Sequence, residues 1–318
     1  MKAPSPAATT LIQVAVFAAA LFVLNRVLEN SMNPYYLRVV VNCGIAGILA
    51  MSLNLINGCA GQFSLGHAGF MAVGAYVSAG LTTVYPAGFM QTELGVGSAI
   101  LAGGCVAGLA GYLVGLPSLR LRGDYLAIVT LGFSEMIRVT FLNINALGGA
   151  RGMYGIPTKT DFFWVYLWVA ITYVCLSRLL KSSRGRAILA LRDDEIAAEA
   201  MGVGVAHYKV VTFAISSFFA GLAGGLFAHY QGFIDPQSFD FSRSVMVVIM
   251  VVLGGMGSLS GSLIGALLVT VLPESLRVFE DYRLVIFPLL LILMMLLRPM
   301  GILGHHEIQD LLLRWRKK

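Results

Sequence analysis

The chain has 318 residues, of which 58% are hydrophobic and only 12% are charged. Soluble domains have roughly 45–50% apolar and about 25% charged residues, so this composition excludes an ordinary water-soluble fold and indicates an integral membrane protein. The net charge of +6 reflects membrane orientation, and nucleic acid is not an expected partner.

Apolar runs of about 20 residues, long enough to cross the hydrocarbon core of a bilayer, recur along the chain. We expect transmembrane helices at residues 9–28, 36–57, 62–84, 95–116, 124–142, 162–180, 208–231 and 283–300. The first run follows Lys2 and resembles a secretory signal peptide, but we expect a retained helix. An interrupted apolar stretch at 243–278 forms either two short crossings or a re-entrant hairpin. These features predict an all-α polytopic membrane protein, with residues 1–318 in one transmembrane domain.

The distribution of lysine and arginine predicts the orientation, because these residues concentrate on the cytoplasmic side. With the N-terminus inside, the predicted spans place segment 178–209 and the tail 301–318 in the cytoplasm, together with Lys2, Arg120, Arg122 and Arg298. Fewer basic residues fall outside: Arg26, Arg38, Arg151, Lys159, Arg243, Arg277 and Arg283. Both termini are therefore predicted to be cytoplasmic.

The stretch GCAGQFSLGHAGFMAVGAY, residues 58–76, is rich in glycine inside an apolar run. Small residues let membrane helices pack closely. Non-helical backbone at membrane depth survives only when it is buried in protein or faces a water-filled cavity. We therefore expect a broken helix at a packed interface or beside a translocation pathway. The candidate residues are Gly61, Gln62, Ser64, Gly66, His67 and Gly69.

A second glycine-rich interruption, LGGMGSLSGSLIGALL, covers residues 253–268. The pattern G-x-x-G-x-x-S occurs in both stretches, at Gly58, Gly61 and Ser64 and again at Gly254, Gly257 and Ser260. Two similar breaks suggest a chain built from two halves, although glycine is common enough here for chance matches. Gly254, Gly257 and Ser260 are therefore candidates for the same role.

Ionisable residues inside predicted spans are candidates for function. His67 makes either a hydrogen bond between helices or a contact with the translocation pathway. Glu135 and Arg138 share one helix face at a spacing of i and i+3, so we expect them to pair, as a structural ion pair or as part of the pathway. The four cysteines lack any metal-ligand spacing, and we interpret them as small packing residues, with no metal and no cofactor.

The longest polar segment between spans, residues 181–209, combines charged residues with helix-favouring alanines and ends with glycine breakers. It predicts one or two short helices at the cytoplasmic face. A compact charged helix held between two membrane helices is suited to binding by a cytosolic protein. The residues proposed for this coupling are Arg192, Asp193, Asp194, Glu195, Ala198, Glu199 and Gly202.

The run ALRDDEIAAEAMGV resembles the cytoplasmic coupling loop of bacterial ABC importer permeases. Residues 36–304 resemble the LivM-type permeases of branched-chain amino-acid importers, the LivH/LivM permease family, through LNLINGCAGQFSLGHAGFMAVGAY, GGARGMYGIP, VLGGMGSLSGSLIGALLV and FPLLLILMMLLRPMGILG. The resemblance implies a vitamin B12-importer-like permease fold with about ten helices per subunit, in the inner membrane of a bacterium. It also implies transport of leucine, isoleucine and valine.

The same resemblance implies partners: a second, related permease, two cytosolic ATPase subunits, a periplasmic substrate-binding protein and membrane lipid. The loop at residues 148–157 departs from the family pattern, because Gly149–Met153 offers no acidic residue. Urea, short amides and other amino acids therefore stay open as substrates.

No G-x-x-x-x-G-K-[ST] phosphate loop occurs in the chain, so ATP hydrolysis is expected on the partner subunits and the chain is not expected to be an enzyme. An ion-coupled secondary transporter or a channel would also use broken helices and His67. That alternative does not explain the charged segment 181–209. A membrane enzyme would need clustered carboxylates, a nucleophile or metal ligands, and the sequence lacks these patterns.

Overall fold

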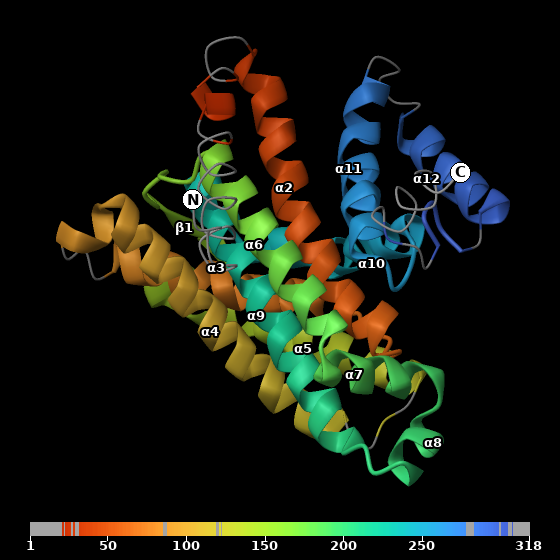
Figure 1. Cartoon of the computed structure of the whole chain (residues 1–318). Helices are drawn as coiled ribbons and strands as arrows, with labels where there is room; N and C mark the ends of the chain where they lie inside the picture. Colours follow the sequence, from red (N-terminus) through yellow and green to blue (C-terminus); the bar gives the residue numbers. More distant parts are fainter. Residues whose placement is uncertain are drawn as a thin grey trace, which may run out of the picture.

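The computed structural model describes residues 21, 23–26, 28, 32–84, 88–118, 121, 123–277, 283–298, 300–304 and 307. The first predicted span, residues 9–28, lies almost wholly outside this part, as does most of the predicted tail 301–318. The described chain is dominated by helices, which confirms the all-α polytopic class (Figure 1).

The elements closely follow the predicted apolar runs. They are α2 (Pro34–Asn54), a π-helical turn (Leu55–Cys59), α3 (His67–Thr83), α4 (Glu93–Ser118), α5 (Asp124–Asn143), β1 (Met153–Tyr154), α6 (Phe162–Lys181), α7 (Ser183–Asp193), α8 (Glu195–Ala200), α9 (Val205–Gln231), β2 (Phe233–Ile234), α10 (Phe241–Gly254), α11 (Leu259–Ser275) and α12 (Arg283–Leu297). Within the described residues, five helical segments are long and apolar enough to cross a membrane: α2 with its π turn, α4, α5, α6 and α9.

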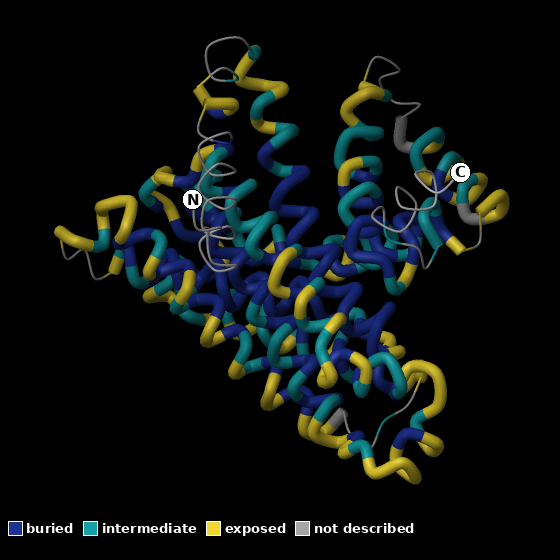
Figure 2. Tube along the Cα trace, viewed as in Figure 1, coloured by how far each residue is buried: buried dark blue, intermediate teal, exposed yellow. Residues whose placement is uncertain are grey.

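Helices α2 and α9 are the most buried of the long helices, and α3 packs against α9 and α4 (Figure 2). The apolar windows of α2 and α9 are 83% and 72% buried, whereas those of α5 and α6 are only 22% buried. Glycine permits this close packing, because a Cβ added at Gly74 would collide with Gly221 of α9 and one at Gly224 would collide with Met71 of α3. The predicted close helix contact is therefore confirmed for α3.

The two ends of α9 carry different structures (Figure 1). Beyond its N-terminus lie the short helices α7 and α8. Beyond its C-terminus, β2 pairs antiparallel with β1, with Met153 opposite Ile234 and Tyr154 opposite Phe233. A small sheet therefore joins two loops that are far apart in the sequence, at the end of α9 away from α7 and α8.

Helices α10 and α11 form a hairpin across the second glycine-rich stretch. They have 14 and 17 residues, which correspond to about 21 and 26 Å at 1.5 Å per residue. The hydrocarbon core is about 30 Å thick. This length favours a re-entrant hairpin over two upright crossings.

One predicted boundary is wrong. The span expected at 62–84 begins as a helix only at His67, because residues 61–66 are irregular and Gly61 has φ +67°. All four cysteines are free, with Cys43 and Cys59 buried and Cys105 and Cys175 exposed on helix faces. The interpretation of cysteines as packing residues therefore holds for two of them only.

Candidate functional site

The first helix break runs from the π turn at the end of α2 to the start of α3. The side chain of Asn57 closes it into a loop, because its Oδ1 accepts from the Ser64 amide at 3.1 Å and its Nδ2 donates to the Ser64 carbonyl at 3.4 Å. The Leu65 amide donates to Thr130 Oγ1 of α5 at 3.1 Å. The backbone groups released by the break are thus partly satisfied by polar side chains, as membrane depth requires.

The second helix break separates α10 from α11. Gly255 and Gly257 have φ +117° and +93°, a region that glycine occupies without strain. The Glu307 carboxylate caps the first turn of α11, accepting from the Leu259 amide at 2.7 Å and from Ser260 Oγ at 2.6 Å. The negative charge at a helix N-terminus stabilises this arrangement.

The two breaks contact each other through Asn54. Its Oδ1 accepts from the Gly257 amide at 2.8 Å, and its Nδ2 donates to the Ser258 carbonyl at 2.9 Å. A Cβ at Gly58 would collide with Asn54 Oδ1 and with the Gly257 nitrogen, so glycine is needed for this close contact. The two interruptions that the sequence marks separately are therefore packed against each other.

His67 and the neighbouring glycines lie at tight helix interfaces. His67 is 1% exposed, and its Nε2 lies 2.7 Å from Ser52 Oγ of α2. A Cβ at Gly69 would lie 2.7 Å from Ser134 Cα of α5, and one at Gly66 would collide with the Thr130 carbonyl. Ser64, Gly254 and Ser260 are also buried. These residues are placed to pack helices within this chain, and a role in the pathway stays a prediction.

The predicted coupling segment is folded as α7 and α8, joined at Asp194. The Asp194 carboxylate caps α8 by accepting from the amides of Ile196 and Ala197 at 2.9 and 3.1 Å. Gly202 ends the segment with φ +83°. Exposed residues of the segment are Arg192, Asp193, Asp194, Ile196, Ala197, Glu199, Ala200, Met201 and Gly202.

Ala198 does not belong to this exposed surface. It is 5% exposed and packs inside the chain, whereas Ile196 and Met201 are 68% and 84% exposed. The predicted coupling surface therefore does not include Ala198, and the apolar side chains of Ile196 and Met201 project beside Ala197 and Gly202. Arg192 pairs with its neighbour Asp193 at 3.0 Å.

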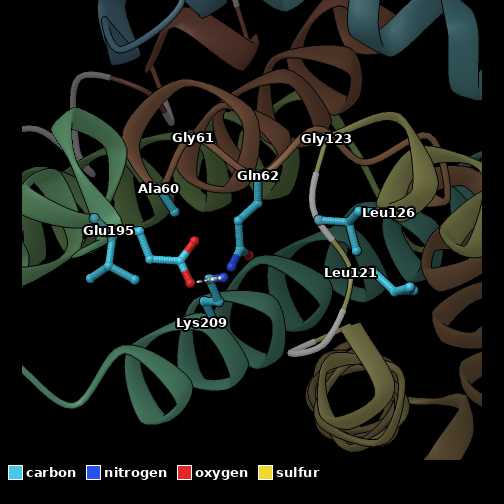
Figure 3. A pocket seen from close by; sticks show the side chains of 9 residues that line it. Ala60, Gly61, Gln62, Leu121, Gly123, Leu126, Glu195 and Lys209 are labelled. Atoms are coloured by element: carbon cyan, nitrogen blue, oxygen red, sulfur yellow. Dashed lines mark hydrogen bonds and ion pairs between the residues drawn. The ribbon is translucent and has the colours of Figure 1, made fainter. Parts of the chain in front are cut away.

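The coupling segment contacts the first helix break directly. A Cβ at Gly61 would lie 3.0 Å from Arg192 Cα. The Glu195 carboxylate accepts from Lys209 Nζ of α9 at 2.6 Å, with the Lys209 side chain 7% exposed. These contacts surround a cavity of about 110 Å³, lined by Ala60, Gly61, Gln62, Leu121, Gly123, Leu126, Leu191, Glu195 and Lys209 (Figure 3).

Gln62 projects from the break into this cavity, toward Lys209 (Figure 3). Gln62 is 6% exposed, and its Oε1 has no hydrogen-bond partner within the described residues. We call this set, made of Gly61, Gln62, Arg192, Glu195 and Lys209, the inner joint. A displacement of α7 and α8 would be transmitted through it, from Arg192 to the broken helix and from Glu195 to α9.

Sequence reasoning missed several residues that hold the site together. Asn54, Asn57 and Ser52 could have been identified from the sequence, because they are polar residues inside a predicted span. Lys209 ends the segment 178–209 that the sequence places in the cytoplasm, so its position alone does not indicate a buried ion pair. Glu307 gave no signal, because its partners in α11 lie nearly fifty residues away.

Comparison with known proteins identifies close relatives. A family model described as "Branched-chain amino acid transport system / permease component" matches residues 35–297. The chain is 40% identical over 292 residues to the Escherichia coli (strain K12) high-affinity branched-chain amino acid transport system permease protein LivM, covering 80% of this chain and 67% of that one.

Two other relatives are also named as branched-chain amino acid transport system permease proteins. The LivM of Salmonella typhimurium (strain LT2) is 39% identical over 291 residues, covering 80% of this chain and 67% of its own length. The E. coli (strain K12) LivH permease is 24% identical over 305 residues, covering 86% of this chain and 97% of LivH. No solved structure matches, so the vitamin B12-importer-like arrangement with about ten helices stays a prediction.

Proposed function

This chain belongs to the family of branched-chain amino acid transport system permease components, and from that premise we propose that it forms half of the translocation pore of an ATP-driven importer for leucine, isoleucine and valine. Its α7–α8 segment is the docking site for cytosolic ATPase subunits. The observation that carries this proposal is the inner joint, because it connects an exposed helix directly to a broken membrane helix.

The exposed surface of α8 has the chemistry of a docking site. Ile196 and Met201 offer apolar side chains, and Glu199 adds a negative charge that favours one orientation of the partner. ATP-driven closure of the ATPase subunits would shift the pore between outward-facing and inward-facing states through differential contacts with α8. Hydrolysis takes place on those subunits and not on this chain.

The partners complete the proposal. A second, related permease forms the other half of the pore; this chain is similar to both LivM and LivH, so a heterodimer is favoured. A periplasmic binding protein delivers substrate at the β1–β2 end, opposite α7 and α8. The complex lies in the bacterial inner membrane with both termini of this chain in the cytoplasm.

Co-purification and uptake test the proposal together. The permease is expressed with its genomic neighbours, purified in mild detergent and reconstituted with the binding protein. We expect two ATPase subunits to be retained and labelled leucine to accumulate only with ATP. Accumulation driven by an ion gradient without ATPase subunits would establish the secondary transporter. Uptake of labelled urea or an amide instead of leucine would reassign the substrate.

A further inference from the structure

Two peripheral helices present their exposed faces differently. The large exposed side chains of α4 are apolar or aromatic, as expected for a helix facing lipid: Leu94, Leu101, Val106, Leu109, Tyr112, Leu113 and Leu116. Helix α5 exposes Tyr125, Ile128, Met136 and Val139, but Glu135 borders this face and pairs with Arg138 one turn later. Contact with lipid therefore explains the exposed face of α4 but not that of α5.

The charged pair on α5 lies well within its predicted membrane span. Arg138 Nε donates to Glu135 Oε2 at 2.8 Å, and the side chains are 25% and 35% exposed. This confirms the expected pairing. Glu135 is eleven residues from the start of α5, or about 17 Å along its axis. A charge at the bilayer centre costs about 2.5–3.5 kcal/mol on insertion scales, so this face is unsuited to lipid.

Gly132, one turn before Glu135, is exceptional among the described glycines inside α-helices. A Cβ there would meet nothing within 4 Å, whereas one at Gly66, Gly69 or Gly74 would collide with a neighbouring helix. A glycine in an exposed helix interior costs about 1 kcal/mol relative to alanine. Since packing within this chain does not require it, Gly132 is suited to close approach by something outside the chain.

The pair leaves hydrogen-bonding capacity unused. In the described part of the chain, Arg138 binds Glu135 through Nε, which leaves its two terminal nitrogens available to another acceptor. Such a guanidinium group recognises a carboxylate through two parallel bonds. The Glu135 carboxylate accepts further donors, and Ile128 and Met136 add apolar surface on either side of Gly132.

We propose that Glu135, Arg138 and Gly132 form a transient binding site for the zwitterionic head group of the transported amino acid. Arg138 binds the α-carboxylate and Glu135 binds the α-ammonium group. Gly132, one turn before Glu135, leaves room for the aliphatic side chain of the substrate. This inference rests on the proposed function, and it places the exposed face of α5 along the water-filled pathway.

Charge complementarity favours a zwitterion over the alternative occupant, a helix of the second permease. A close-packed apolar helix would desolvate the Arg138–Glu135 pair and offer no acceptor to the remaining guanidinium nitrogens, which is costly. An amino acid supplies both groups and also the apolar side chain. The alternative predicts that this face is closed to water-soluble reagents.

Accessibility tests the site directly in the assembled importer. In a background with Cys105 and Cys175 replaced by alanine, Gly132→Cys is treated with a membrane-impermeant charged thiol reagent during transport. We expect it to react, and leucine to slow the reaction about tenfold. The matched control, Leu109→Cys on α4, should stay unreactive. 4-Methylpentanoate and 3-methylbutylamine, which each lack one charged group of leucine, should give no protection.

Transport measurements test the two charged residues. Arg138→Lys keeps the positive charge and the ion pair but removes the planar fork, so uptake should fall about tenfold. Glu135→Gln should have a similar effect. ATP hydrolysis stimulated by the binding protein should stay within about twofold of wild type, as should uptake by the control Glu93→Gln, which changes an exposed carboxylate on α4.

Each contrary outcome is distinct. An unreactive Gly132→Cys shows that protein or lipid covers the face and overturns the proposal. A reactive cysteine without leucine protection overturns the substrate assignment. Normal uptake by Arg138→Lys shows a structural ion pair only. If Arg138→Lys fails to assemble, the cysteine experiment decides. Failure of the proposed function itself would appear as absent ATP-dependent leucine uptake in the wild type.

Discussion

The inner joint and the outer surface of α8 lie next to each other, yet they are built in opposite ways. In the joint, Gly61 lies against Arg192, and Lys209 is almost fully buried against Glu195. On α8, Ile196, Glu199 and Met201 project away from the chain. The difference teaches that the joint is held by contacts within this subunit, whereas the surface of α8 is open, as the proposed docking site requires. Substitutions should therefore act on stability in the joint and its neighbouring breaks, and on coupling at the surface of α8.

The largest loss of stability is expected at the packed side of this comparison. Gly69→Leu places a Cβ 2.7 Å from Ser134 Cα, so the free energy of unfolding should fall by about 3 kcal/mol through overpacking. Uptake should be lost while the protein still inserts. Thermal unfolding in detergent and leucine uptake measure the two effects. Gly97→Ala, whose nearest neighbour would be at 3.9 Å, is the control; equal effects of the two changes would refute the packing explanation.

The second largest loss of stability is expected at the ion pair of the inner joint, between Glu195 and Lys209. Lys209→Ala removes the ion pair with Glu195 and should lower the free energy of unfolding by about 2 kcal/mol, somewhat less than for a fully buried pair. The exposed fraction of the Glu195 side chain, 25%, is the reason for the smaller value. The double variant Glu195→Lys, Lys209→Glu should recover part of the loss. A double variant less stable than the single one would show that the charges do not act as a pair.

His67 should show a smaller effect. His67→Asn keeps a hydrogen-bonding group beside Ser52 but removes part of a buried ring, so we expect a loss of about 1 kcal/mol. If His67 only makes a hydrogen bond between helices, the ratio of uptake at about pH 6 to uptake at about pH 8 should be the same in the variant as in the wild type. A variant that transports normally at one of these pH values and loses the wild-type pH dependence would instead place His67 in the pathway.

The smallest effect on stability, with a large effect on coupling, is expected on α8. Glu199→Ala should change the free energy of unfolding by no more than about 0.5 kcal/mol. Gly202→Asp should cost about 1 kcal/mol because Gly202 has φ +83°. Both should reduce uptake and stimulated ATP hydrolysis together at unchanged permease levels. Wild-type values of both in reconstituted vesicles would remove this segment as the docking site.

The sequence allowed the helices to be predicted because apolar runs of about 20 residues are a local signal. It also marked both glycine-rich breaks and the segment that became α7 and α8. It did not reveal that the breaks meet, since Asn54 and Gly257 are separated by 203 residues. Nor did it distinguish buried Ala198 from exposed Ala197, because that depends on how α8 packs against α9. The late start of α3 at His67 reflects the Asn57–Ser64 hydrogen bonds, which no propensity describes.

The contact of Asn54 with the α10–α11 hairpin has a consequence for synthesis in the cell. Asn54 enters the membrane early, but its partner Ser258 lies 204 residues later in the chain. At about 5–20 residues per second, a ribosome takes roughly 10–40 s to supply it. During that interval the amide must find other hydrogen bonds, within its own chain or in the insertion machinery. The nascent N-terminal half is therefore incompletely folded until the second half has been synthesised. Its resistance to proteolysis should increase when translation of the second half is fast.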